Sequence, residues 1–150
     1  MRPEDPEVQR WIGRSMVAQL ATLSRKDVPA LTPLWFIYDR GHLYMATEQL
    51  TLAAHNIAAH SHVVLLLHAE QHGKQNRILR ITGTATCHPN VPPWRVMLRF
   101  AMKYYLSPRG LRSELSHRRK WRLRQRYYAQ AQPATIELVP ENAEFVPQTV

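Results

Sequence analysis

Short runs rich in apolar and β-branched residues recur along this chain, separated by polar turns, and the pattern predicts a mainly β protein. We expect strands at residues 16–23, 30–39, 43–47, 62–69, 77–87 and 134–140. Apolar residues at helical spacing predict helices at residues 5–16, 52–60, 94–106 and 111–130. Because many strands are combined with few helices, we expect a small antiparallel β-barrel with helices outside it.

Single residues refine several of these elements. Pro33 has no N–H to donate, so its strand is expected at a sheet edge or a bulge. Gly83 interrupts a long strand and is expected to let that strand bend. Thr51 is a suitable N-cap for the helix that follows it. The helix at 94–106 carries two stripes, an apolar one of Trp94, Met97, Leu98, Ala101 and Tyr105 and a basic one of Arg95, Arg99 and Lys103.

The net charge of +9 is concentrated in one part of the sequence. Residues 95–126 contain eleven basic residues and one acid, whereas the rest of the chain has nine basic and ten acidic residues. The sequence therefore predicts a nearly neutral body with a basic segment. We expect a single domain over residues 1–150, in which 94–130 is a basic helical insert before the last strand.

Nothing in the sequence suggests export or a membrane span. No apolar run reaches the roughly 18 residues that span a bilayer. The N-terminal residues have no apolar signal-like region, and the single cysteine, Cys87, excludes an internal disulfide. We therefore expect a cytoplasmic protein without a transmembrane segment.

Several of these segments together resemble the pyridoxamine 5′-phosphate oxidase-like family of flavin-binding split barrels. The resemblance rests on "VAQLATLSRKDVPALTPLWFIYDRGHLYMAT", a following helix with Asn56, "HVVLLLH" and "RILRITGTAT". It implies a six-stranded antiparallel split β-barrel, mainly β within the α+β class, which assembles as a homodimer. With the strand pattern, it predicts a core around Ala21, Leu34, Phe36, Val64, Leu66, Leu79 and Ile81.

The resemblance also implies a cofactor site in a groove between two subunits. FMN, or a deazaflavin in some branches of the family, would lie there and carry the redox chemistry on a small-molecule substrate. By position in the family pattern, Thr51 would contact the cofactor phosphate. The residues beside the ring system would be Thr32, Pro33, Leu34, Trp35, Phe36, Ala46 and Thr47.

The sequence departs from the family at the phosphate. The family often has Arg-Lys directly after the hydroxyl residue, but this chain has Leu52 and Ala53. We therefore expect weak FMN binding, with a deazaflavin or no cofactor as the alternatives. Replacement charge has three candidate sources: Arg80 with Arg77 beside it, His55 in the helix, and the basic insert.

Other candidate chemistry is limited. Five histidines occur within residues 55–72, but no HExxH motif is present and we predict no metal site. No general acid or base is assigned, and Tyr44, Tyr104 and Tyr105 are only possible proton donors. The stretch "HRRKWRLRQRYY" at 117–128 combines cations with aromatic residues, which suits an anionic cofactor tail, nucleic acid or a membrane surface.

These observations leave two functions. The favoured one is an FMN- or deazaflavin-dependent oxidoreductase with the cofactor at the dimer interface. The alternative is a non-catalytic split-barrel dimer whose cofactor groove is degenerate and which binds an anionic partner through residues 95–126.

Overall fold

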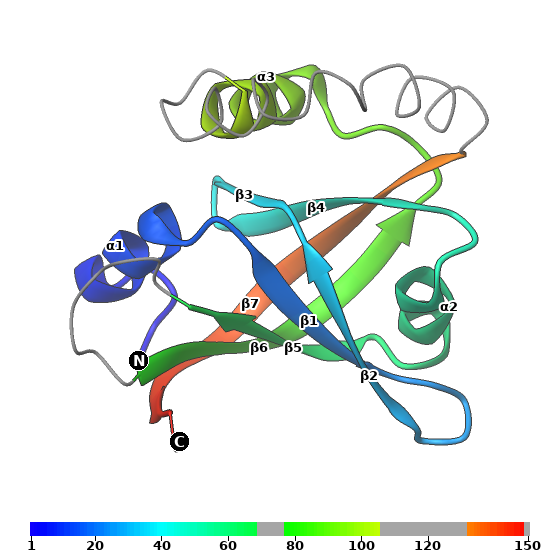
Figure 1. Cartoon of the computed structure of the whole chain (residues 1–150), viewed down its shortest axis with the longest axis horizontal. Coiled ribbons are helices and arrows are strands. Elements are labelled where there is room, and N and C mark those ends of the chain that lie inside the picture. The colour runs from blue at the N-terminus through cyan, green and yellow to red at the C-terminus, as the bar shows by residue number, and fades with distance from the viewer. Residues whose placement is uncertain (69–76, 106–131, 149–150) are drawn as a thin grey trace, which may run out of the picture.

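A computed structural model describes residues 1–68, 77–105 and 132–148 (Figure 1). The elements, in chain order, are α1 (Pro6–Arg14), β1 (Ala18–Leu23), β2 (Pro29–Leu34), β3 (Phe36–Asp39), β4 (His42–Glu48), α2 (Leu52–Ala59), β5 (His62–Leu67), β6 (Arg77–His88), α3 (Trp94–Tyr104) and β7 (Pro133–Pro147). The helix expected at 111–130 lies outside the described residues.

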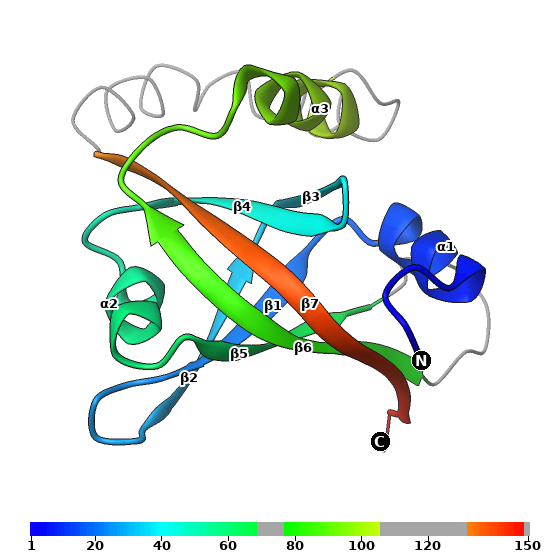
Figure 2. The ribbon, with the colours of Figure 1, turned by 180° about the vertical axis from the view of Figure 1, so that it is seen from behind.

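The strands form one antiparallel sheet in the order β2-β1-β5-β6-β7-β4-β3. The two strands at the ends of this order, β2 and β3, are consecutive in the chain and are separated only by Trp35. The sheet must therefore curl until its two edges approach each other. Figure 2 shows the long strands β6 and β7 crossing the back of the resulting half-barrel. The split-barrel fold expected from the sequence is confirmed.

The sheet has seven described strands rather than six, because the strand expected at 30–39 is divided at Trp35. The side chain of Tyr104, from α3, lies at this division. The N–H of Phe36 donates to the Tyr104 hydroxyl at 3.0 Å, and the same hydroxyl lies 2.8 Å from the carbonyl oxygen of Met16. The backbone can leave the first ladder here because a side chain from α3 satisfies its N–H group.

Gly83 lies at the irregularity in the longest ladder, as its position in the sequence predicted. The β6–β7 register shifts between Thr82 and Gly83, so that Thr82 is opposite Asn142 and Gly83 is opposite Pro140. A Cβ on Gly83 would overlap the carbonyl oxygen of Val139. Only glycine permits this close approach of the two backbones.

The core prediction was right on β3 and β6 and wrong on β1 and β5. Phe36, Leu79 and Ile81 are fully buried, and Leu34 packs against the core. The expected Ala21, Val64 and Leu66 lie on the other face of the sheet and are only partly buried, whereas Leu20, Val63, Leu65 and Leu67 fill the interior. The error is a shift of one residue, which exchanges the two faces of a strand.

Helix α1, predicted at 5–16, packs on the barrel with Val8, Trp11 and Ile12 buried. The Trp11 indole N–H donates to the carbonyl oxygen of Leu67 at 2.8 Å and fixes the helix to β5. No helix in the described part of the chain is long and apolar enough to cross a membrane.

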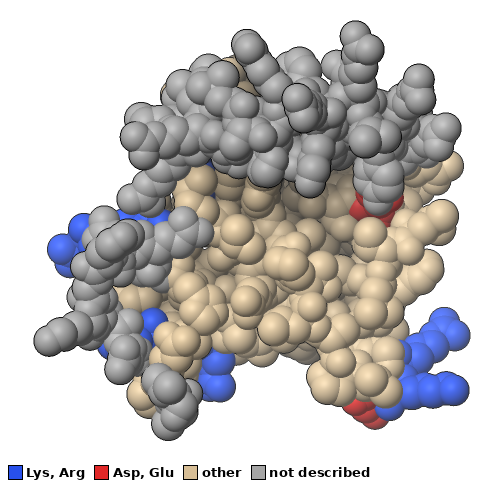
Figure 3. Space-filling model, in the orientation of Figure 1, with Lys and Arg blue, Asp and Glu red and all other residues tan. Residues whose placement is uncertain are grey.

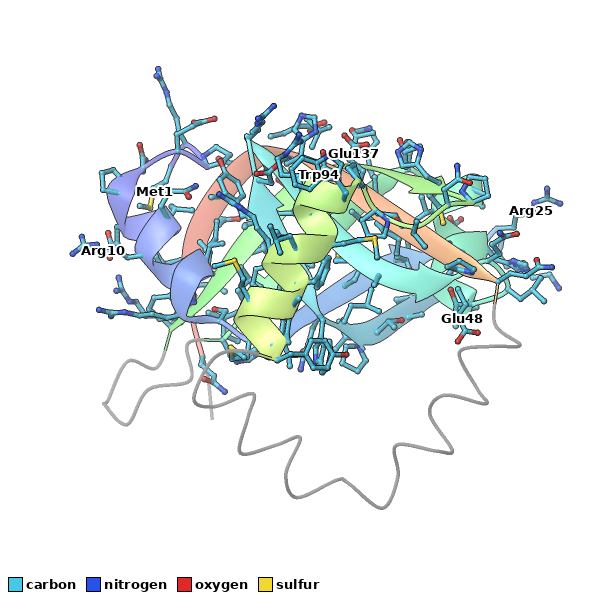
Figure 4. All side chains as sticks on the ribbon, turned by 90° about the horizontal axis from the view of Figure 1, so that it is seen from above. Met1, Arg10, Arg25, Glu48, Trp94 and Glu137 are labelled. Carbon is cyan, nitrogen blue, oxygen red and sulfur yellow. The ribbon has the colours of Figure 1, made fainter. Side chains whose placement is uncertain are left out.

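Helix α3 lies over the sheet, where it contacts β3 (Figure 4). Its basic stripe faces that strand. Arg95 donates to Asp39 at 2.9 Å, Arg99 to the carbonyl oxygen of Tyr38 at 2.7 Å, and Lys103 to that of Phe36 at 3.2 Å. The apolar stripe of α3 is turned outward, and Trp94 at its start is 77% exposed. The described part of the basic insert is therefore bound to the barrel through its cations.

Candidate functional site

An uncharged surface surrounds β2, the strand that the sequence analysis placed beside a cofactor. Figure 3 shows this face of the molecule, where the middle has neither basic nor acidic side chains. The side chains of Leu31, Pro33 and Trp35 are exposed along β2, and those of Thr32 and Leu34 are half-buried. Because β2 ends the sheet, its outer edge has no neighbouring strand among the described residues. Pro33 therefore lies on an edge strand, as predicted.

The start of α2 and the end of β4 come together through two hydroxyl groups. The Oγ1 atoms of Thr47 and Thr51 are 3.1 Å apart. Thr51 is the N-cap, as predicted: its Oγ1 accepts from the N–H of Ala54 at 3.3 Å and donates to the carbonyl oxygen of Glu48 at 3.0 Å. To bind a phosphate at this point, the Thr51 hydroxyl would have to donate to the phosphate instead of to the carbonyl oxygen of Glu48. The N–H groups of the first turn of α2 have no acceptor within the helix.

Asn56 holds α2 in place. This side chain is buried, and its Nδ2 donates to Thr22 Oγ1 at 3.0 Å. The bond joins α2 to β1, the neighbour of β2 in the sheet. The residue that formed part of the family resemblance thus positions the helix whose first turn faces the proposed phosphate.

The two positions where the family often has Arg-Lys are not equivalent in this fold. Leu52 is 60% exposed, whereas Ala53 is 1% exposed and belongs to the core. A cation at position 52 would reach solvent at the helix start. A lysine at position 53 would have to enter the barrel interior or displace the helix.

Arg80 lies on the outer face of β6, between the buried Leu79 and Ile81, and not at the start of α2. It is paired with Glu144. Thr47 is opposite Ala134, ten positions earlier on β7, which corresponds to about 30 Å along the strand. Arg77, at the start of the same strand as Arg80, pairs with Glu7 at 3.1 Å. Within one chain, Arg80 is therefore separated from the predicted phosphate position.

His55 is exposed and lines a cavity of about 430 Å³ beside α2, together with Arg25 from the β1–β2 turn. Sequence reasoning did not single out Arg25, because it is 30 residues away from His55 along the chain. Figure 4 shows Arg25 at the end of the molecule opposite Arg10 of α1. Of the three proposed charge sources, His55 is the one that lies in α2 itself, and Arg25 lines the same cavity.

The possible proton donors lie on the α3 side of the sheet. The hydroxyl of Tyr104 is buried and bonded to backbone groups. The pKa of Tyr44 is raised, first by burial and then by the negative charges of Glu137 and Asp39. The Tyr104 ring stacks on Trp35 beside β2, but its hydroxyl bonds to the backbone of Phe36 and Met16.

Three neighbouring strands are joined by a carboxylate between two histidines. Glu137 of β7 lies 2.6 Å from Nδ1 of His42 on β4 and 2.9 Å from Nε2 of His88 on β6. Burial alone would raise the pKa of Glu137, but the hydrogen bonds from the two histidines outweigh it and the pKa lies below its ordinary value. No group of three or more His, Cys, Asp or Glu side chains in the described ranges is arranged to hold a metal ion.

Glu137 is expected to make the fold sensitive to acid. A carboxyl group whose pKa is lowered by folding contributes stability above its unfolded pKa, and this is lost as the pH falls through the folded pKa. We expect the free energy of unfolding to fall between about pH 5 and pH 3, and to fall less in Glu137→Gln. Urea unfolding across this range measures the effect. Glu4→Gln, which removes an exposed carboxylate, is the control. If the free energy of unfolding depended on pH equally in Glu137→Gln and in the wild type, the prediction would be wrong.

The Tyr104 hydroxyl is expected to stabilise the division between β2 and β3. Tyr104→Phe keeps the ring, which stacks on Trp35 at a centroid distance of 4.5 Å, but leaves the buried N–H of Phe36 without an acceptor. The expected loss is about 1–3 kcal/mol in the free energy of unfolding. Tyr38→Phe is the control, because the Tyr38 hydroxyl has no hydrogen-bond partner among the described residues. Equal unfolding midpoints for both variants would exclude this role.

The curled antiparallel sheet, in which α2 begins directly after β4, is the architecture of a split-barrel protein. The sequence model of the pyridoxamine 5′-phosphate oxidase family matches residues 4–133, and the chain belongs to that family. The matched range includes residues 94–130, which the sequence suggested to be an insert. No curated protein sequence matches the chain.

Solved structures with several different names share the fold. An F420 reductase is 16% identical with a TM-score of 0.63, covering 91% of this chain and 94% of its own. A putative pyridoxamine 5′-phosphate oxidase from Listeria innocua is 15% identical with a TM-score of 0.63, covering 95% and 97%. The haem storage protein HutZ from Vibrio cholerae is 16% identical with a TM-score of 0.65, covering 98% and 95%. At these identities the similarity establishes the fold alone.

Proposed function

We propose that the protein binds FMN or a deazaflavin beside β2 and acts as an oxidoreductase on a small molecule. The observation that carries the proposal is the open, uncharged edge of β2 next to the first turn of α2. Backbone N–H and C=O groups on an open edge suit the polar rim of an isoalloxazine ring, and exposed apolar side chains suit its faces. Family membership supports the same assignment.

The residues that would hold the cofactor are those expected from the family pattern. The backbone of Thr32–Trp35 would meet the ring, with Ala46 and Thr47 beside it, and the first-turn N–H groups of α2 would meet the phosphate. Phe36, the last residue of the expected set, is buried, and its backbone N–H and C=O are already bonded to α3. Arg80 would contact the cofactor only from a second protomer. The bound group would supply the hydride or electron acceptor, while this chain orients it and excludes water.

A homodimer is part of the proposal. Leu31 of β2 is 55% exposed, and Leu50 and Leu52 at the start of α2 are 82% and 60% exposed. Exposed apolar side chains that gather on one surface indicate an interaction site. A second copy over this surface would cover them and close the groove around the cofactor.

The proposal predicts saturable cofactor binding at Ala46. This residue is exposed on β4, so Ala46→Phe is expected to fill the groove without disturbing the core. Purified protein incubated with FMN or a deazaflavin is separated from free cofactor, and bound cofactor per chain is read from the visible spectrum. We expect binding to be lost in Ala46→Phe and retained in Thr86→Phe, a matched exposed strand position. Absence of binding by the wild type, or equal binding by all three proteins, would refute the proposal.

A further inference from the structure

A pocket of about 480 Å³ lies where α1, β3 and α3 meet. Figure 4, which looks down on α3, shows α1 beside it. Residues from all three elements line the pocket, and none of them belongs to the predicted flavin site. The volume is within the range of pockets that enclose most of a small organic ligand.

The lining combines an apolar wall with positive charge. Ile12 of α1, Ile37 of β3 and Met102 of α3 supply apolar surface, and Arg99 and Lys103 supply the charge. Among the described residues that line the pocket, none is acidic. The carboxylate that contacts Arg99 is Asp39, which is buried and shared between Arg95 and Arg99.

Arg99 retains donors for a ligand. Its Nη1 donates to the carbonyl oxygen of Tyr38 at 2.7 Å and lies 3.4 Å from Asp39 Oδ1. Among the described residues, Nε and Nη2 of Arg99 have no hydrogen-bond partner. The planar guanidinium is thus held by one nitrogen, while the remaining N–H groups have the geometry that carboxylates accept.

Gly13 opens the pocket on the α1 side. It lines the cavity, and a Cβ at this position would meet no atom within 4 Å. The helix around it is intact without a side chain there, although glycine is an unfavourable residue within a helix. A side chain at position 13 would therefore have space beside the pocket.

We propose that this pocket binds an organic monocarboxylate with an apolar body. The apolar part lies against Ile12, Ile37 and Met102, and the carboxylate lies against Arg99 and Lys103. One carboxylate suits the site because Nε and Nη2 of Arg99 present it with two neighbouring donors. This ligand site is separate from the flavin site proposed above and does not depend on it.

Octanoate is the probe, and octylammonium, with the same tail and opposite charge, is its control. Isothermal titration of the full chain is expected to show one saturable site for octanoate and none for octylammonium. Arg99→Gln is expected to weaken octanoate at least about tenfold, as is typical for the loss of a charge-assisted hydrogen bond. Lys103→Gln is expected to weaken octanoate in the same way, and it leaves the ion pairs of Asp39 in place. Arg10→Gln, an exposed cation on α1 outside the lining, is expected to bind as the wild type does.

Gly13→Phe distinguishes this pocket from the exposed apolar stripe of α3. The new side chain enters the pocket, so octanoate binding is expected to be lost while the circular dichroism spectrum is unchanged. Octanoate binding that persists in folded Gly13→Phe would place the ligand elsewhere and overturn the proposal. So would equal binding of octanoate and octylammonium, or wild-type affinity in both Arg99→Gln and Lys103→Gln.

Discussion

Gly83→Ala is expected to lower the free energy of unfolding by about 3 kcal/mol or more. The added methyl group would overlap the carbonyl oxygen of Val139 and lie 3.0 Å from the Cα of Pro140. Both obstacles are backbone atoms of β7, in the longest ladder of the sheet, so no side chain can rotate away. The strands must separate at the bulge or lose hydrogen bonds. Urea unfolding followed by circular dichroism measures the loss.

Gly13→Ala is the matched control for this substitution. The same methyl group meets nothing within 4 Å in α1, and alanine is the better helix former. We expect Gly13→Ala to be as stable as the wild type or more stable by up to about 1 kcal/mol. If Gly83→Ala unfolded at the same urea concentration as Gly13→Ala, the close approach of β6 and β7 at the bulge would be wrong.

Leu52→Arg is expected to tighten FMN about tenfold. The side chain at position 52 is exposed at the first turn of α2, where it would add a charge-assisted contact to a phosphate on the helix N-terminus. Such contacts contribute about 1.5–3 kcal/mol, and the lower value applies at an exposed position. Quenching of flavin fluorescence in a titration gives the affinity. Ala58→Arg, exposed in the last turn of the same helix, adds equal charge and is expected to leave the affinity unchanged.

The neighbouring position is expected to behave differently. Ala53→Lys would bury an amine in the core and is expected to cost about 3 kcal/mol of stability rather than to strengthen binding. The structure thus separates two positions that the family pattern treats as a pair. Equal FMN affinity for Leu52→Arg, Ala58→Arg and the wild type would mean that the phosphate does not lie at the start of α2.

Local chemistry was predictable where one residue type has few alternatives. Thr51 is followed by a helix and caps it, and Gly83 coincides with the bulge. Pro33 lies on an edge strand because a central strand would need its N–H. In each case a backbone requirement is visible in the sequence itself.

The faces of β5 were not predictable, because "VVLLL" is apolar at every position and alternation leaves no phase to read. The orientation of α3 was hidden for a related reason. Its stripes are visible in the sequence, but the sequence does not show that β3 offers carbonyl oxygens and Asp39 to the basic one. A partner far away in the chain determines which stripe faces the barrel.

The candidate site was also predictable only in part. The strand, the hydroxyl pair and the helix start follow from local order in the sequence. The distance between Arg80 and Thr51, and the approach of Arg25 to His55, follow from the sheet order and the β1–β2 turn. Long-range geometry of this kind cannot be read from the pattern of one strand or one helix.

The most direct test of the proposed cofactor site is amide hydrogen exchange with and without FMN, repeated with a deazaflavin. We expect slower exchange on binding at Thr32, Leu34 and Trp35, at Ala46 and Thr47, and in the first turn of α2. The pocket between α1 and α3 should be unaffected. Protection confined to other strands, or no change at cofactor concentrations that saturate binding, would contradict the placement of the flavin beside β2.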